Sequence, residues 1–170
     1  SQFPAVAAGS SGRVYVGYIA LTSLVDPTHN ARIYVNRSLD GGSSFGTFHA
    51  TTAAALTLPG YVDFTTSFGD FVQADTAGHG LLISPAPVLA VSPTDSLVVY
   101  AAWTHHQSGW DTTYQAACCG GSATQQTFQA ADIAFVRSTD GGTTWGAPLR
   151  VNDDALNNAK DQFTPALSVS

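Results

Sequence analysis

The chain has 170 residues, enough for about one domain with a buried core. Its formal net charge is −6 and its few basic residues are scattered, which excludes binding along a nucleic-acid backbone. No apolar run approaches the roughly 18 residues of a membrane span, so we expect no membrane insertion. The chain has no Glu or Met but many Val, Thr, Tyr and Phe, and this composition favours strands over helices.

The first elements along the chain are short apolar segments separated by turns. Phe3-Pro4-Ala5-Val6-Ala7-Ala8 leads through a Gly- and Ser-rich turn into an apolar run at 14–18. Turn residues between β-rich runs are typical of a hairpin. A third strand is expected at 32–37 and a fourth at 47–51, with an Asp-Gly-Gly turn at 40–42 between them. The first part of the chain thus predicts four antiparallel strands.

The same order of segments returns later. Ala86-Pro87-Val88-Leu89-Ala90-Val91 precedes an apolar run at 98–103, and further strands are expected at 132–137 and 149–152. The first motif appears once more at Thr164-Pro165-Ala166-Leu167-Ser168-Val169. The chain therefore contains an internal repeat of a four-stranded unit.

The repeat is longer than usual because it carries two insertions. The aligned prolines lie 83 and then 78 residues apart, whereas compact propeller repeats span about 40–50 residues. The excess lies at 52–84, after the fourth strand of the first unit, and at 104–131, between the second and third strands of the second unit.

Repeated units of four antiparallel strands predict an all-β fold built of β-propeller blades. We predict two blades plus the first strand of a third. Residues 1–83 form blade 1 with its insertion before the next blade, 84–163 form blade 2 with its insertion between its second and third strands, and 164–170 form the first strand of a following blade. Propellers close with about four to eight blades, so we expect remaining blades or further copies of the chain to complete a ring.

The segments around the two Asp-Gly-Gly turns repeat each other 100 positions apart. Seven of the fifteen positions in 32–46 are identical to those in 132–146, where about one would match by chance. Both copies fit Ser-x-Asp-x-Gly-x-Ser/Thr-Trp/Phe, and through this motif the chain resembles the Asp-box, or BNR-repeat, propellers, a group that includes the sialidases. The resemblance implies a ring of such blades in a secreted or cell-surface protein.

The residues of the motif suit a folding role. Gly tolerates positive φ in the turn, the Asp carboxylate can accept backbone amides of its own turn, and Ser can add a hydroxyl bond. The aromatic residue is expected to fold inward and bury its ring. The resemblance places the turn on the outer side of the propeller, so we predict a structural Asp-box in each blade: Ser38, Asp40, Gly42 and Phe45, then Ser138, Asp140, Gly142 and Trp145.

The catalytic residues that the resemblance implies are incomplete. Sialidases use a cluster of arginines, a Tyr activated by a Glu, and an Asp as acid/base. This chain has no Glu, and Phe3-Pro4 lacks the Arg of the family's Phe/Tyr-Arg-Ile-Pro motif. Arg37 and Arg137 precede the Asp-box, where we expect a structural role. We therefore assign no catalytic residue.

The insertion of blade 2 is the candidate ligand loop, because propeller ligands bind at the loops between the second and third strands and between blades. It offers His105, His106, Trp110, Asp111 and Tyr114, of which Trp and Tyr could stack on sugar rings. The alternative is a surface loop that folds on itself. Adjacent His side chains on a strand point to opposite faces, so joint metal ligation is not expected.

Two further features leave alternatives open. Asp153, Asp154 and Asp161 could hold Ca²⁺ through oxygen ligands, although Asn/Asp clusters are also common in plain turns. No cofactor is required. Cys118 and Cys119 could form a strained vicinal disulfide, or they could be reduced or paired with cysteines elsewhere.

The leading functional hypothesis is a segment of a secreted or cell-surface Asp-box propeller that binds glycan or protein, or acts as an extracellular scaffold. The alternative is part of a sialidase-type glycoside hydrolase whose Glu and arginine cluster lie outside this chain. Fold by itself does not decide between them.

Overall fold

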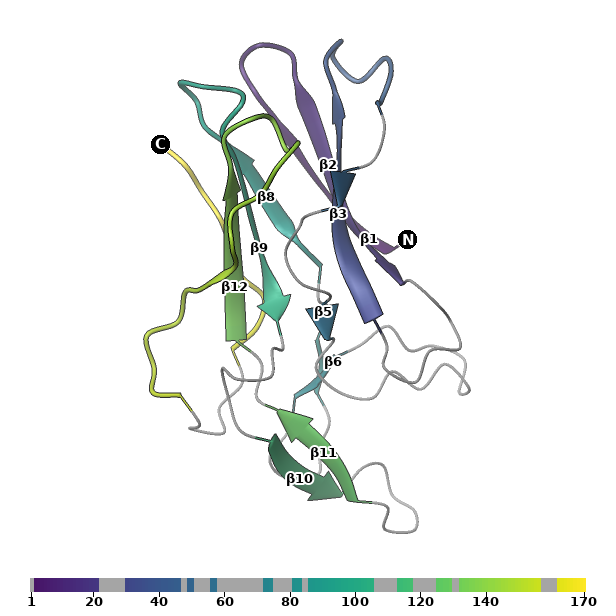
Figure 1. The fold of residues 1–170 in the computed structure, drawn as a ribbon, viewed down its shortest axis with the longest axis vertical. Helices are drawn as coiled ribbons and strands as arrows, with labels where there is room; N and C mark the ends of the chain where they lie inside the picture. The colour runs from purple at the N-terminus through teal and green to yellow at the C-terminus, as the bar shows by residue number, and fades with distance from the viewer. Residues whose placement is uncertain are drawn as a thin grey trace.

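The computed structural model describes two larger antiparallel sheets that stand side by side (Figure 1), and two short hairpins. Among the residues that the structure describes, all regular elements are strands. In the same residues, no helix has the length and apolar character of a membrane span. The described residues are 2–21, 30–46, 49–50, 56–57, 72–74, 81–83, 86–105, 113–117, 125–129, 132–156 and 162–170.

The first sheet is blade 1. Its strands are β1 (Gln2–Ala8), β2 (Val14–Leu21), β3 (Asn30–Ser38) and β4 (His49–Ala50), and they pair antiparallel in that order. The short strand β5 (Leu56–Thr57) pairs with the beginning of β3.

The second sheet is blade 2. Its strands β8 (Val88–Val91), β9 (Val99–His105), β12 (Asp132–Ser138) and β13 (Leu149–Arg150) also pair antiparallel in chain order. The predicted all-β fold with two four-stranded blades is therefore confirmed.

The fourth strand of blade 2 is shorter than the predicted 149–152, because a side chain replaces part of its ladder. The backbone amide of Val151 still donates to the Ile133 carbonyl at 2.9 Å. The amide of Ile133, however, donates to the side-chain Oδ1 of Asn152 at 3.0 Å rather than to a backbone oxygen. Regular pairing therefore ends at Arg150.

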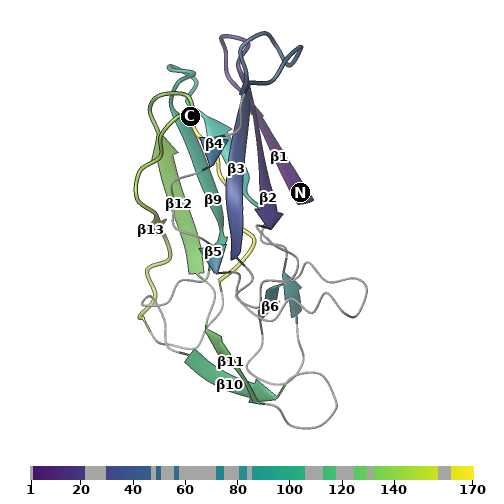
Figure 2. The same cartoon turned by 45° about the vertical axis from the view of Figure 1, so that its right-hand side comes forward.

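Both insertions contain short hairpins. In the first, β6 (Val72–Ala74) pairs with β7 (Leu81–Ile83), and in the second, β10 (Thr113–Ala117) pairs with β11 (Gln125–Gln129). The hairpin β10–β11 lies beyond the end of the two blades that is opposite the Asp-box turns (Figure 2). The described part of the second insertion beyond β9 is thus a single hairpin, and its role as a ligand loop stays a prediction.

The core lies between the two blades. Alternate residues of β2, β3, β9 and β12 face the neighbouring sheet, as the period of two along a strand requires. Gly17 faces Leu89, whose Cδ1 lies 3.0 Å from where a Cβ would stand, so glycine here lets the sheets approach closely. The buried cluster consists of Tyr15, Ile19, Ile33, Val35, Val99, Ala101, Trp103, Ala134, Val136 and Trp145.

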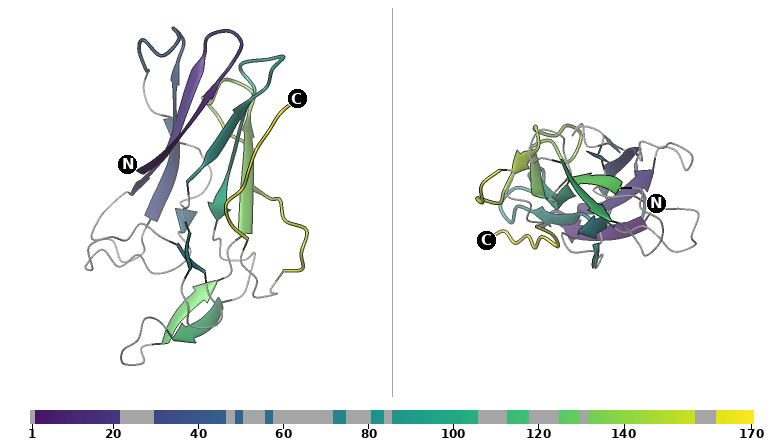
Figure 3. Two further views of the ribbon diagram at one scale, coloured as in Figure 1. Left: turned by 180° about the vertical axis from the view of Figure 1, so that it is seen from behind. Right: turned by 90° about the horizontal axis from the view of Figure 1, so that it is seen from below.

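Residues 162–170 run along the side of blade 2 that faces away from blade 1. The amide of Thr164 donates to Thr104 Oγ1 at 3.2 Å. Thr104 points away from the core yet is 1% exposed. The left panel of Figure 3 shows this yellow segment beside the green strand β12. These residues form no strand in the structure, and their assignment as the first strand of a following blade stays a prediction.

Candidate functional site

The Asp-box of blade 1 is a closed set of local hydrogen bonds. Ser38 Oγ donates to Asp40 Oδ1 at 2.6 Å and accepts the Gly42 amide at 2.8 Å. The Ser44 amide donates to Asp40 Oδ1 at 2.8 Å, and Ser44 Oγ donates to Oδ2 at 2.5 Å. Gly41 and Gly42 have φ of 72° and 93°, which L side chains rarely adopt. Both carboxylate oxygens of Asp40 are therefore engaged within the turn.

Blade 2 repeats this geometry. Ser138 Oγ donates to Asp140 Oδ1 and accepts the Gly142 amide, each at 2.8 Å. The Thr144 amide and hydroxyl donate to the two Asp140 oxygens at 2.8 and 2.6 Å. The hydrogen bonds of both motifs close their own turns, which is the folding role predicted from the sequence.

These bonds set the charge state of both carboxyls. Hydrogen bonds from Ser38 and then Ser44 lower the pKa of Asp40 from 3.8 to about 2. The Thr144 hydroxyl and amide lower the pKa of Asp140 from 3.8 to about 2. A carboxylate this acidic, with its oxygens occupied by its own turn, is ionised near neutral pH and unsuited to act as a general acid.

The aromatic position of the motif differs between the blades. Trp145 is 7% exposed, and its Nε1 donates to the Gly142 carbonyl at 3.1 Å. Phe45, the corresponding residue, is 44% exposed. The prediction that the ring folds inward is therefore confirmed for Trp145 and wrong for Phe45. The reason is the neighbour: Trp145 packs in the core between the blades, whereas Phe45 is not part of that core.

The Asp-box of blade 2 also receives an arginine from blade 1. Nη1 of Arg37 donates to the carbonyls of Asp140 and Gly141 at 3.1 and 2.9 Å, and lies 3.3 Å from Thr143 Oγ1. The structural role expected for Arg37 is thus a contact between blades.

A second contact completes this junction. The Tyr15 hydroxyl donates to the Ser96 carbonyl at 2.6 Å in a buried position, and burial raises the pKa of Tyr15. We call Tyr15 and Arg37 with their acceptors in blade 2 the interblade clamp. In the sequence, nothing marked Tyr15 or Ser96 as functional residues.

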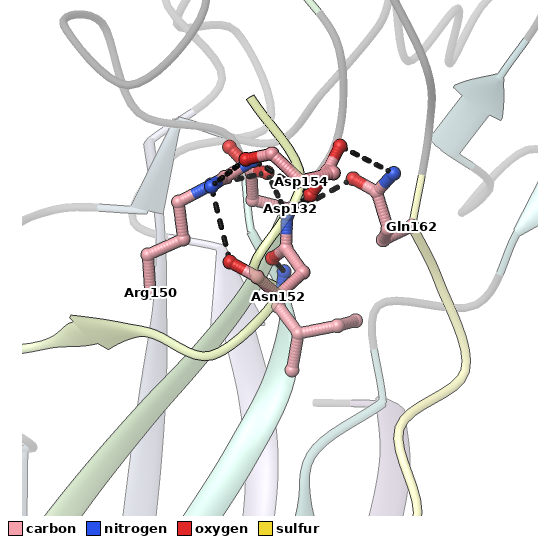
Figure 4. A network of polar contacts seen from close by, with 6 residues as sticks. Asp132, Arg150, Asn152, Asp154 and Gln162 are labelled. Carbon is pink, nitrogen blue, oxygen red and sulfur yellow. Dashed lines mark hydrogen bonds and ion pairs between the residues drawn. The ribbon is translucent and has the colours of Figure 1, made fainter. Parts of the chain in front are cut away.

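A polar network lies at the opposite end of blade 2 (Figure 4). The buried carboxylate of Asp132, 2% exposed, accepts Arg150 Nε at 2.7 Å. Asp154 accepts Arg150 Nη2 at 2.9 Å through Oδ1 and Gln162 Nε2 at 3.0 Å through Oδ2. Asn152 Nδ2 donates to Asp132 Oδ1 at 2.6 Å. One guanidinium therefore bridges two carboxylates and holds the end of β13 on β12.

The sequence interpretation singled out Asp154 here but missed Asp132, Arg150 and Gln162. A comparison of the two repeats could have found the ion pair, because the positions equivalent to Asp132 and Arg150 are Arg32 and Ala50 in blade 1. The ion pair therefore belongs to one blade and not to the repeat.

Of the three residues predicted to hold calcium, the structure describes two. Asp154 is in the network, Asp153 is exposed, and Asp161 lies outside the described residues. Among the described residues, no group of three or more His, Cys, Asp or Glu side chains is placed to hold a metal ion. The calcium site stays a prediction.

The predicted ligand loop falls mostly outside the described residues, as do Cys118 and Cys119. His105 is the last residue of β9, where its backbone pairs with Asp132. Tyr114 lies on β10 opposite Phe128. His106, Trp110 and Asp111 are not among the described residues. The structure therefore fixes where this insertion leaves and re-enters blade 2, at the end opposite the Asp-box.

The comparisons with known proteins find similarity to sialidases. No family model matches the chain. The chain is 26% identical over 136 residues to a protein named sialidase from Bacteroides fragilis (strain YCH46), a match that covers 78% of this chain and 22% of the relative. The solved structure of the Hadza microbial sialidase Hz136 aligns with a TM-score of 0.47 and 21% identity over 88% of this chain and 25% of its own. The chain thus spans a quarter or less of the length of these relatives. The sequence match confirms the predicted similarity to the sialidases.

Proposed function

We propose that this two-blade segment belongs to a secreted or cell-surface sialidase-type propeller and serves there as a glycan-binding scaffold. The observation that carries the proposal is that the two ends of the blades differ: one is closed by hydrogen-bonded turns, and the other carries the insertions. At one end, the polar groups of each Asp-box form hydrogen bonds within their own turn, and Arg37 of the interblade clamp bonds to the Asp-box of blade 2. At the other end, both long insertions leave the sheets.

The insertion of blade 2 is the part proposed to contact the glycan. It leaves β9 at His105 and returns to β12 at Asp132. Trp110 and Tyr114 lie within it in sequence, and aromatic rings with polar neighbours suit the apolar faces and hydroxyl groups of sugars. The rigid blades would then position a loop that carries the binding, an arrangement common in proteins.

A second candidate function rests on the match to the Bacteroides fragilis sialidase. On this alternative the chain is part of a glycoside hydrolase, and the activating Glu and the arginine cluster lie elsewhere in a longer protein. The absence of Glu from the sequence favours the non-catalytic role for this segment itself.

The test measures binding and turnover on the same samples. The 170-residue chain is applied to a panel of sialylated and sialic-acid-free glycans and, separately, incubated with a fluorogenic sialoside. We expect binding that Trp110→Ala or Tyr114→Ala weakens at least tenfold, with no turnover. Phe45→Ala is the matched control, because this exposed ring belongs to the Asp-box at the other end of the blade.

Two results would contradict the proposal. Sialoside turnover by this chain alone would make the segment catalytic. Glycan binding that responds equally to Phe45→Ala and to the two insertion variants would place the site away from the insertion.

A further inference from the structure

The face of blade 2 that points away from blade 1 consists of the same repeat positions as the face that blade 1 presents to blade 2. The strand registers define the correspondence. Tyr15 pairs with Arg37 across β2 and β3, and Tyr100 pairs with Arg137 across β9 and β12. The two pairs are therefore equivalent positions of the repeat, and both consist of a Tyr beside an Arg.

The apolar positions of the two faces correspond as well. Ile33 and Val35 of blade 1 lie in the core, and their equivalents in blade 2 are Ile133 and Phe135. The ring of Phe135 stacks on Tyr100 with centroids 5.9 Å apart. We call Tyr100, Ala102, Thr104, Ile133, Phe135 and Arg137 the outward face of blade 2.

The outward face is only partly covered. Ala102 and Thr104 are 4% and 1% exposed, whereas Arg137 at the far end of the face is exposed. Its guanidinium makes no hydrogen bond to any side chain or carbonyl in the described part of the chain. Arg37, its equivalent, donates to three oxygens of a neighbouring Asp-box.

The covered part shows what kind of element fits the face. Thr104 is bonded to the amide of Thr164, which begins the third copy of the motif that opens each blade. In the junction between blades 1 and 2, that motif belongs to β8, which packs against β1 and β2. Residues 164–169 therefore lie on blade 2 as β8 lies on blade 1.

We propose that the outward face of blade 2 is the docking site of a third Asp-box blade whose first strand is formed by residues 164–169. Arg137 donates to the two backbone carbonyls of that blade's Asp-Gly turn, and the Tyr100 hydroxyl donates to a carbonyl in the turn before its second strand. The partner is recognised through main-chain carbonyls, so any Asp-box blade in this position presents the required acceptors. In the junction between blades 1 and 2, Arg13 Nη1 also donates to Ser96 Oγ at 2.7 Å. This contact has no equivalent here, because position 98 is Val.

A second copy of the chain is the competing occupant. Its blade 1 also presents an Asp-box, with Phe45 exposed beside it. To dock, however, the second copy would have to place its β1 on the part of the outward face that residues 164–169 already occupy. The covalently attached segment is therefore favoured, and copy-to-copy docking becomes an outcome of the test.

The test compares the 170-residue chain with a chain extended by one blade. Ser170 aligns with Ser92, so a second copy of residues 93–163 is appended after Ser170 in register with the repeat. Arg137→Ala is introduced into both chains, and Arg37→Ala serves as the matched control because its clamp is present in both. Thermal unfolding is followed by near-UV circular dichroism, and mass in solution by sedimentation.

We expect Arg137→Ala to leave the Tm of the 170-residue chain within about 1 °C and to lower that of the extended chain by roughly 3–10 °C. Arg37→Ala should lower the Tm of both. Equal shifts for Arg137→Ala in the two chains would overturn the proposal, and so would an appended blade that stays unfolded and protease-sensitive. Self-association of the 170-residue chain that Arg137→Ala abolishes would overturn it in favour of a second copy. None of these outcomes depends on glycan binding, so the proposed function stands or falls separately.

Discussion

The aromatic position of the Asp-box offers the sharpest test of the packing between the blades. Trp145 is 7% exposed and Phe45 is 44% exposed, although the two residues occupy the same place in their repeats. A Trp side chain buries roughly 150–250 Å², which at about 25 cal/mol per Å² corresponds to about 4–6 kcal/mol. Measured costs of Trp→Ala in protein cores are about 3–5 kcal/mol. We therefore expect Trp145→Ala to cost about 3–5 kcal/mol and Phe45→Ala about 1 kcal/mol.

Thermal or urea unfolding of the two variants measures this difference directly. For a chain of this length, about 1 kcal/mol corresponds to roughly 2–4 °C in Tm, so the expected falls are about 6–20 °C and 2–4 °C. Trp145→Phe should fall between them, because it keeps an apolar ring but loses the bond from Nε1 to the Gly142 carbonyl. Equal losses for Trp145→Ala and Phe45→Ala would show that the motif stabilises each blade by itself and that the contact between blades is not what buries Trp145.

Three further predictions concern the turns and the polar network. Gly141→Ala should destabilise more than Gly41→Ala in urea unfolding, because a Cβ at 141 would stand 2.7 Å from Arg37 Nη1, whereas at 41 nothing lies within 4 Å. Both glycines have positive φ, so strain alone would give equal losses. The wild-type chain should lose stability as pH falls from about 4 to about 2, since the pKa of Asp140 is about 2 when folded and 3.8 otherwise, and Asp140→Asn should flatten that slope. An unchanged slope would contradict the role given to its hydrogen bonds. Arg150→Met should cost about 3–5 kcal/mol because it leaves the Asp132 carboxylate buried without its cation, and adding Asp132→Asn should restore part of the loss.

The parts of the fold that followed from the sequence are those set by local chemistry. The Asp-Gly-Gly turns require positive φ and bond to side chains within four residues, so a short motif predicts them completely. The flanking strands follow from alternation and from the turns that bound them. The fourth strand was predicted too long because the side chain of Asn152, rather than its backbone, bonds to Ile133.

The parts that the sequence did not predict depend on contacts between distant segments. The bond from Tyr15 to Ser96 joins residues 81 positions apart, and that from Arg37 to Gly141 joins residues 104 apart. No periodicity within one blade indicates such a partner. The exposure of Phe45 follows the same logic, because it depends on which blade lies beside it.

The two repeats therefore differ where they meet neighbours and agree where they meet only themselves. Leu89 packs against the core, whereas Val6, its equivalent, is 66% exposed, and Trp103 is 1% exposed where Tyr18 stands in blade 1. Where side chains pack against a neighbouring blade, the residue at each repeat position differs with that neighbour. Arg37 and Arg137 remain identical, although Arg37 lies on the interface between the blades. The structure gives a physical reason: the acceptors of Arg37 are backbone carbonyls of an Asp-Gly turn, and every Asp-box presents the same carbonyls whatever its side chains. An arginine that binds main-chain atoms is independent of its neighbour's sequence, and this is why the same residue can serve successive junctions of a repeated fold.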